Sequence, residues 1–399
     1  MKPPTVLLVT TMRWLPTARL AIALARAGFS VEAVCPSEHP IQKTTVVRRT
    51  FPYRGLRAIN SVSAAIAATH PDLLVCGDDL SVKHLHSLYK LSLGASGAAI
   101  RGLIERSVGA PRHFDLIEDR ASFMRVCEEA GVRVPRSAVI NDPKDLDQWA
   151  AKYGFPLVLK ANGTSGGEGV RIVRSADQAR QALQRLQAAP FIARAVKRAV
   201  FDHNTTLLWP SILGRKTGIS AQSFIPGTEA TSAVACWKGE VVAGLHFQVL
   251  QKSDPEGPST VLRRIAHPEM VSAVDKMVRR LELSGLHGFD FMLSHEHHDA
   301  YLIEINPRVT QVGHLSFGPG HDLPAGLLAA LNGVAASPSP PVTENDVVAL
   351  FPKEWLRDPT SPYLHSGYHD VPWDQAELVR DYLRKPARQG SRKRRATRR

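Results

Sequence analysis

Cysteine is scarce in this chain, and its spacing excludes two kinds of site. Only four of the 399 residues are cysteine, and no two of them form a CxxC pair. Four cysteines this far apart, without a CxxC pair, do not suggest a disulfide framework or a zinc site. We therefore expect neither. Cys35 and Cys76 each close an apolar run, which is typical of residues in a buried core.

Long apolar runs are lacking as well. No stretch approaches the roughly 20 residues needed to cross a bilayer. The N-terminal segment MKPPTVLLVTTMRWLPTARLA has only a short apolar stretch and does not resemble a signal peptide. We expect a cytoplasmic protein without membrane contact. With 44% hydrophobic residues, the chain can bury a substantial core in two or three domains.

Acidic residues are absent from residues 384–399, which carry nine Lys or Arg. The whole chain has a net charge of +13, so the other 383 residues carry only +4. Such a basic run is typical of a disordered, solvated tail. The alternative is weak contact with nucleic acid, or with anionic lipid, without sequence preference. No interleaved aromatics indicate sequence-specific RNA recognition.

The first hundred residues alternate between strand-like and helix-like stretches, which predicts a parallel sheet with flanking helices. The expected strands are 5–11, 29–36 and 71–79, and the expected helices are 18–28, 59–70 and 80–91. The loop after the first strand, TTMRWLP, contains no glycine, so the dinucleotide fingerprint GxGxxG is absent and NAD binding is not expected there. Residues 94–102, GASGAAIRG, lack the Lys-Ser/Thr of a P-loop and indicate a flexible connection into a helix.

Glycine is concentrated in residues 155–173, FPLVLKANGTSGGEGVRIV. The pattern predicts a strand ending in Lys160, a glycine-rich hairpin, and a second strand. Triphosphate oxygens need backbone N–H donors at close range, which glycine permits, and a lysine adds a positive charge. Because the lysine precedes the glycines and a strand follows, this is not a P-loop, and we expect a flap over a nucleotide. The alternative is an ordinary glycine-rich surface hairpin.

Acidic side chains converge in residues 285–311. GFDFML and AYLIEIN read as two strands joined by the polar turn SHEHHD, which brings Asp290 opposite Glu304. Asn306 shares a strand face with Glu304 because side chains alternate. Oxygen-bearing side chains on an otherwise apolar hairpin suit Mg²⁺. Three histidines in the turn suggest zinc instead, but an exposed polar tip needs no metal.

Together the two segments resemble the ATP-grasp superfamily over roughly residues 110–330. EINPR (304–308) is most similar to carbamoyl-phosphate synthetase large chains, and biotin carboxylases and D-alanine–D-alanine ligases are also similar. The resemblance implies an α/β and α+β architecture: an N-terminal Rossmann-like parallel sheet domain, then a two-lobed ATP-grasp fold. The implied parts are an N-terminal domain (1–110), an ATP-grasp domain (111–333), a C-terminal extension (342–383) and the basic tail (384–399).

The resemblance also implies a role for individual positions. Lys160 would reach the nucleotide phosphates, and Arg308 would stabilise the transferring phosphoryl group. Glu229 would accept hydrogen bonds from the ribose. The flap would contain Gly163, Gly166, Gly167 and Gly169, the adenine edge would be lined by Gln222, Ser223 and Ile225, and Asp290, Glu304 and Asn306 would hold Mg²⁺.

Arg120 marks a departure from the superfamily pattern. Counting back from Gly131 places it where a second phosphate-side lysine often stands. Arginine keeps the charge but changes the geometry of the donors. Arg263 and Arg264 are candidates for binding an acyl phosphate or a substrate carboxylate, or they are surface residues on a strand.

The function implied is an ATP-dependent ligase that joins a small-molecule carboxylate to an amine through an acyl phosphate, with Mg²⁺ or Mn²⁺. The alternative is an ATP-binding sensor or scaffold without ligase activity. The complete set of Asp290, Glu304 and Asn306 favours the ligase. A homodimer is the default oligomeric state. Residues 342–383 retain Trp, Phe and Leu and are expected to fold, but no motif in them indicates a role.

Overall fold

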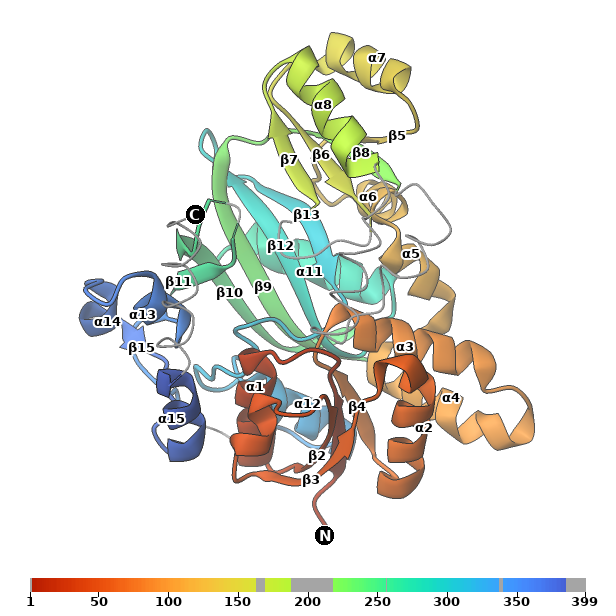
Figure 1. Ribbon diagram of the computed structural model, residues 1–399, viewed down its shortest axis with the longest axis vertical. Helices are drawn as coiled ribbons and strands as arrows, with labels where there is room; N and C mark the ends of the chain where they lie inside the picture. The colour runs from red at the N-terminus through yellow and green to blue at the C-terminus, as the bar shows by residue number, and fades with distance from the viewer. Residues whose placement is uncertain (1, 163–168, 188–217, 256, 337–339, 385–399) are drawn as a thin grey trace, which may run out of the picture.

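The computed structural model describes residues 2–162, 169–187, 218–255, 257–336 and 340–384. Three β-sheets organise this part of the chain: an N-terminal sheet, a small sheet at the opposite end of the molecule, and a large sheet between them (Figure 1). Within these residues, no helix combines the length and the apolar character needed to span a membrane.

The N-terminal sheet is parallel, with strand order β3-β2-β1-β4. Its central strand β1 is almost entirely buried because helices cover a parallel sheet on both faces. Helix α1 ends at Gly28, whose φ of +113° is a conformation that suits glycine. The elements are β1 (Thr5–Val9), α1 (Leu15–Ala27), β2 (Ser30–Cys35), β3 (Val47–Pro52), α2 (Ala58–Thr69), β4 (Leu73–Cys76), α3 (Asp79–Leu91) and α4 (Gly94–Val108).

Two features of this region differ from the expectation. The sequence pattern does not predict β3, because this edge strand exposes Arg48, Arg49 and Thr50 and lacks apolar alternation. Residues 94–102 are not a connection but the first turns of α4. The helix packs against β4, so tertiary contacts outweigh the low helix propensity of its glycines.

The small sheet is antiparallel, with strand order β5-β8-β6-β7. Leu157, Leu159 and Ala161 of β6 pack against the two helices that cover one face, α7 and α8. Because side chains alternate along a strand, Val158 and Lys160 lie on the other face. The elements are α5 (Phe114–Glu118), α6 (Arg120–Glu129), β5 (Ser137–Ile140), α7 (Pro143–Tyr153), β6 (Leu157–Ala161), β7 (Val170–Val173), α8 (Ala176–Gln187) and β8 (Ile219–Ser223).

The large sheet has the order β13-β12-β9-β10-β11-β14-β15 and lies at the centre of the molecule (Figure 1). Helices α11 and α12 pack on opposite faces, as the alternation along β9 shows. Val234 and Cys236 belong to the α11 core, and Ala233 and Ala235 belong to the α12 core, which continues into the N-terminal sheet. The elements are β9 (Gly227–Trp237), β10 (Glu240–Lys252), β11 (Ser259–Arg264), α11 (Pro268–Arg280), β12 (Gly285–Ser294), β13 (Ala300–Asn306) and α12 (Leu323–Asn332).

The C-terminal segment extends the large sheet instead of forming a separate unit. Strand β14 pairs with β11, and β15 pairs with β14. Buried Glu354 accepts a hydrogen bond from Thr260 Oγ1 of β11 at 2.7 Å. It also forms an ion pair with Arg357. These contacts fix the segment against the sheet. Its elements are β14 (Val347–Ala349), α13 (Lys353–Arg357), α14 (Tyr363–Ser366), β15 (Tyr368–His369) and α15 (Ala376–Arg384).

Candidate active site

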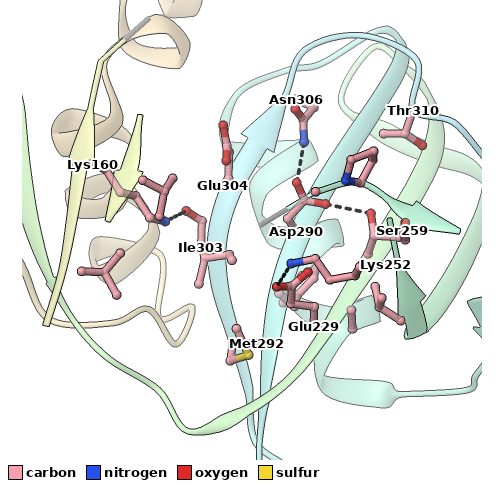
Figure 2. Close-up of a pocket in the computed structure, with 18 of the residues that line it drawn as sticks. Lys160, Glu229, Lys252, Ser259, Asp290, Met292, Ile303, Glu304, Asn306 and Thr310 are labelled. Atoms are coloured by element: carbon pink, nitrogen blue, oxygen red, sulfur yellow. Dashed lines mark hydrogen bonds and ion pairs between the residues drawn. The ribbon is translucent and has the colours of Figure 1, made fainter. Parts of the chain in front are cut away.

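A cavity of about 600 Å³ lies between the small sheet and the large sheet, and its walls also include Met12, Trp14, Asp78 and Asp79 from the N-terminal region. Lys160 of β6 and Glu304 of β13 both line it, although they are far apart in sequence (Figure 2). The two segments singled out in the sequence therefore meet at one cavity. A pocket of this size, with a few charged groups among apolar walls, is typical of a small-molecule site.

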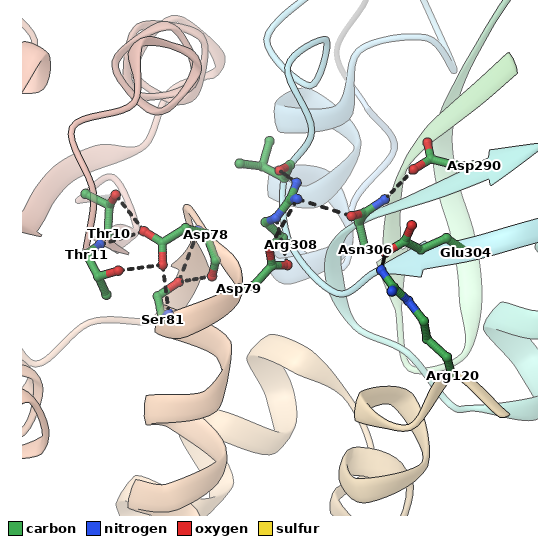
Figure 3. A network of polar contacts seen from close by, with 11 residues as sticks. Thr10, Thr11, Asp78, Asp79, Ser81, Arg120, Asp290, Glu304, Asn306 and Arg308 are labelled. Atoms are coloured by element: carbon green, nitrogen blue, oxygen red, sulfur yellow. Dashed lines mark hydrogen bonds and ion pairs between the residues drawn. The ribbon is translucent and has the colours of Figure 1, made fainter. Parts of the chain in front are cut away.

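The predicted acidic hairpin is confirmed by the strand register. In the antiparallel pair β12–β13, Asp290 stands opposite Glu304, and Asn306 stands opposite Gly288. Asp290 accepts hydrogen bonds from Thr231 Oγ1 at 2.9 Å and from Asn306 Nδ2 at 2.8 Å. The three oxygen-bearing side chains thus share one end of the hairpin, as Figures 2 and 3 show.

Burial makes this cluster electrostatically unusual. Desolvation, reinforced by the charge of Glu304, raises the pKa of Asp290 to about 6. Glu304 is partly exposed to the cavity, with 30% of its side-chain surface accessible. Two carboxylates held together in this way are destabilised unless a cation lies between them or beside them.

Lys160 enters the cavity from the opposite wall. Its Nζ lies 3.3 Å from the carbonyl oxygen of Ile303, next to Glu304 in sequence (Figure 2). Burial lowers the pKa of Lys160 to about 8, although the charge of Glu304 opposes this effect. A further anionic partner would therefore stabilise the charged form of Lys160.

Arg120 joins the two walls of the cavity. Its Nη1 donates to the carbonyl oxygen of Ala161 in β6 at 2.8 Å, and its Nη2 lies 2.7 Å from Glu304 Oε1. Asp119, immediately before it, caps helix α6 by accepting from the backbone N–H of Ser122 at 3.0 Å. The cap fixes the start of the helix, so Arg120 extends from its first turn toward the acidic hairpin.

Arg308 joins the same hairpin to the N-terminal domain (Figure 3). Its guanidinium pairs with both carboxylate oxygens of Asp79 and donates to Asn306 Oδ1 at 3.2 Å. Asp79 begins α3 directly after Asp78, a buried residue that caps the same helix. No motif in the sequence indicates a role for Asp79, because its partner lies 229 residues away.

The predicted adenine segment also lines the cavity. Gln222 and Ser223 end β8, Ile225 follows, and Glu229 lies on β9. Glu229 Oε1 forms an ion pair of 2.7 Å with Lys252 Nζ (Figure 2). Lys252 therefore belongs to this end of the cavity, although no motif in the sequence indicates it.

Some predicted residues cannot be placed in the cavity. Gly163, Gly166 and Gly167 of the expected flap lie outside the described residues, as does nearly all of the basic tail. Gly169 is described, and its carbonyl oxygen accepts from the backbone N–H of Ala161 at 2.9 Å, which closes the β6–β7 hairpin.

The two arginines of β11 lie elsewhere. Arg263 is exposed, and Arg264 pairs with Asp346 and stacks over Phe317. Neither is among the residues that line the cavity.

The residues at the acidic hairpin suit magnesium more than a softer metal. In the part of the chain that the structure describes, no three His, Cys, Asp or Glu side chains gather at a metal-binding distance. Asp290, Glu304 and Asn306 instead offer two carboxylates and one amide, all oxygen donors. Such a set is too small for a closed structural site but fits a hard cation that keeps water and phosphate ligands.

Residues 119–316 match the model of the family "Carbamoyl-phosphate synthase L chain, ATP binding domain". The carbamoyl phosphate synthase large chain of Thermus thermophilus is 27% identical over 296 residues, covering 71% of this chain and 24% of that protein. The large chain of Pseudomonas syringae pv. tomato is 26% identical over 220 residues, covering 55% and 18%. This chain therefore spans a quarter or less of the length of these relatives.

Solved structures share the same fold. N5-carboxyaminoimidazole synthetase from Staphylococcus aureus, complexed with ADP, has a TM-score of 0.59 at 14% identity, covering 84% of this chain and 79% of that one. The biotin carboxylase domain of the Hydrogenobacter thermophilus 2-oxoglutarate carboxylase, in complex with MgADP and bicarbonate, also has a TM-score of 0.59, at 16% identity and coverages of 85% and 72%. These structural matches confirm the fold class predicted from the sequence, and the family match shows that residues 119–316 are similar to an ATP-binding domain of the ATP-grasp type.

Proposed function

We propose that this protein is an ATP-dependent ligase that activates a small-molecule carboxylate and joins it to an amine. The observation that carries the proposal is the cavity itself. Lys160 brings positive charge to one wall, and Asp290 and Glu304 bring negative charge to the other, where Arg120 contacts Glu304. A triphosphate with its cation needs both charges at close range.

The two ends of the cavity correspond to the two ends of a nucleotide. Gln222, Ser223 and Ile225 would lie along the adenine, and Glu229 would accept from the ribose hydroxyls. Lys160 and Arg120 would contact phosphate oxygens, together with the glycine-rich segment around Gly169. The support for this orientation is that the adenine segment and the acidic hairpin line different parts of one continuous cavity.

We expect Mg²⁺ to be held by Asp290, Glu304 and Asn306. Mn²⁺ would substitute for it because it also binds oxygen ligands. The ion would neutralise charge on the β- and γ-phosphates. Asn306 Oδ1 accepts from Arg308, and Asp290 accepts from Thr231 and Asn306. These bonds hold the donor oxygens in place before the nucleotide binds, so little reorganisation is needed.

The reaction would proceed by two displacements. A carboxylate oxygen of the first substrate attacks the γ-phosphorus of ATP, and the bond to the β-phosphate bridging oxygen breaks, which releases ADP and leaves an acyl phosphate. The amine then attacks the acyl carbon, inorganic phosphate departs with the C–O bonding pair, and the nitrogen loses a proton. Arg308 would stabilise the phosphoryl group during the first displacement, because its guanidinium is held at the hairpin.

The proposal is tested by measuring ADP release from the full-length protein with Mg²⁺, ATP and pools of amino acids, short peptides or bicarbonate, and by mass analysis of the products. A pool that stimulates ADP release and yields an amide-type product supports the ligase. Glu304→Gln should abolish turnover while the circular dichroism spectrum stays native. Wild-type turnover by this variant would contradict the metal assignment.

The alternative, a sensor that binds ATP without ligating anything, predicts a different outcome in the same assay. It would show tight ATP binding and no turnover with any substrate pool. The paired carboxylates disfavour it, because a sensor does not need a buried acidic pair whose ionisation is costly.

A further inference from the structure

Lys353 lies in the wall of the same cavity, and nothing in the nucleotide arrangement above uses it. It comes from FPKEW, in the C-terminal segment for which the sequence indicated no role. It is the first residue of α13, and the ion pair and hydrogen bonds of the neighbouring Glu354 anchor this helix to β11. The backbone of Lys353 is therefore held in place by the contacts between α13 and β11.

The ammonium of Lys353 has donor capacity to spare. Its Nζ donates to Gln311 Oε1, whose amide nitrogen donates in turn to Ser259 Oγ. A lysine ammonium has three N–H donors, so one amide oxygen leaves others available. Within the described residues, no carboxylate forms an ion pair with Lys353. Burial accordingly lowers its pKa to about 8 without any opposing negative charge.

A second polar group in the wall of the same cavity has no hydrogen-bond partner among the described residues. Thr310 lines the cavity with 9% of its surface accessible, and among the described residues its Oγ1 has no hydrogen-bond partner. Buried hydroxyls are normally satisfied, so an orphaned one at a cavity wall indicates that a ligand or water completes it. Thr310 directly precedes Gln311, the partner of Lys353, and all three residues line the cavity.

The acidic residues that the N-terminal region contributes to this cavity are already engaged. Asp78 accepts from Thr10, Thr11 and Ser81, and Asp79 is paired with Arg308. Their negative charges are thus matched by donors of the protein itself. Among the described residues, Lys353 thus brings to the cavity a positive charge with which no carboxylate pairs.

We propose that Lys353, with Thr310 and Gln311, forms a binding site for an anionic group, a carboxylate or a phosphate, on the substrate that accompanies ATP. The proposal rests on the proposed function, because it assigns a substrate class to the same cavity. It also gives the C-terminal segment a role: this segment closes the large sheet and presents a cation to the substrate. The ligase would accordingly select acidic or phosphorylated small molecules over neutral ones.

The test is a calorimetric titration of the full-length protein saturated with Mg²⁺ and a non-hydrolysable ATP analogue, so that the γ-phosphate position is filled. The probes are inorganic phosphate and acetate, which separate the two sources of negative charge. Lys353→Met should weaken binding of the preferred probe by about tenfold or more, and Lys353→Arg should retain it. Affinity for the analogue should not change, and the exposed Lys144→Met serves as the matched control.

The outcomes separate the two proposals. If neither probe binds to the wild type beside the analogue, or if Lys353→Met binds them equally well, the anion site is wrong and the nucleotide assignment stands. If the analogue does not bind at all, the nucleotide assignment is wrong.

A second measurement needs no variant and no nucleotide. Amine-reactive labelling of the wild type at about pH 8, read by peptide mass spectrometry, should show Lys353 protected by phosphate or acetate and Lys144 unaffected. Equal labelling of Lys353 with and without both anions would overturn the anion site.

Discussion

Arg308 Nε lies 2.9 Å from Asp79 Oδ1, which ties the end of the acidic hairpin to the first turn of α3 in the N-terminal domain (Figure 3). The guanidinium also donates to Asn306 Oδ1 and lies over the ring of Trp14 at 5.6 Å from its centroid. The guanidinium of Arg308 therefore contacts both Asp79 of the N-terminal region and Asn306 of the acidic hairpin. This pair connects the acidic hairpin to the N-terminal region of the chain.

Removing the charge of Asp79 should accordingly change the position of Arg308 and leave the binding of ATP nearly unchanged. We expect Asp79→Asn to lower kcat by about tenfold, because a misplaced cation stabilises the moving phosphoryl group less well. The KM for ATP should stay nearly constant. Steady-state ADP release measures both constants. Asp115→Asn, which removes an exposed ion pair with Lys90, is the control, and an equal loss of kcat in both variants would show a nonspecific effect.

Local patterns in the sequence predict the acidic hairpin but not the residues that complete the cavity. The alternation in β12 and β13 sets Asp290 opposite Glu304, and the register confirms it. Lys353 and Gln311 meet only because the C-terminal segment adds strands to the large sheet, a contact that no local period encodes. The role of Asp79 is likewise not predictable from local sequence, because its partner Arg308 lies 229 residues away.

The limits of local prediction are equally clear in the N-terminal region. An edge strand with exposed arginines carries no apolar alternation, so β3 leaves no trace in the pattern. The glycines of α4 favour a loop when read by propensity alone, yet the apolar face of the helix packs on β4. In both cases the deciding interaction is tertiary.

Glu229 offers a direct test of the nucleotide's orientation. If its carboxylate accepts from the ribose hydroxyls, Glu229→Gln should raise the KM for ATP by about tenfold, since a charged acceptor is lost. The same variant should change the KM for 2′-deoxy-ATP much less. The comparison of both nucleotides in both proteins isolates the hydroxyl contact from the ion pair with Lys252. Equal changes for the two nucleotides would place the ribose elsewhere.

A substitution at Arg120 tests whether activity depends on arginine at a position where the superfamily often has a phosphate-side lysine. Its fork reaches the carbonyl of Ala161 and the carboxylate of Glu304 at the same time, which a single ammonium cannot reproduce with the same geometry. Arg120→Lys should lower the rate of ADP release by about tenfold. Arg125→Lys, on the same helix but exposed, should have no effect. A wild-type rate in Arg120→Lys would mean that charge alone suffices.

Glu354 predicts how the C-terminal segment responds to acid. Although burial acts in the opposite direction, hydrogen bonds and ion pairing from Arg357, Ser361 and Thr260 lower its pKa to about 2. The folded state thus binds this proton less readily than the unfolded chain does, so the stabilisation is complete above about pH 4.5 and is lost as the pH falls toward 2.

Glu354→Gln should lower the free energy of unfolding by about 3 kcal/mol at pH 7, as expected for a broken buried ion pair. The difference from the wild type should shrink by half or more by about pH 3, because the wild-type carboxylate then loses its advantage. Urea unfolding at pH 7, 4.5 and 3 measures this, with the exposed Glu344→Gln of the same segment as the control. A destabilisation independent of pH would mean that packing, and not the charge of Glu354, holds the C-terminal segment and its Lys353 in place.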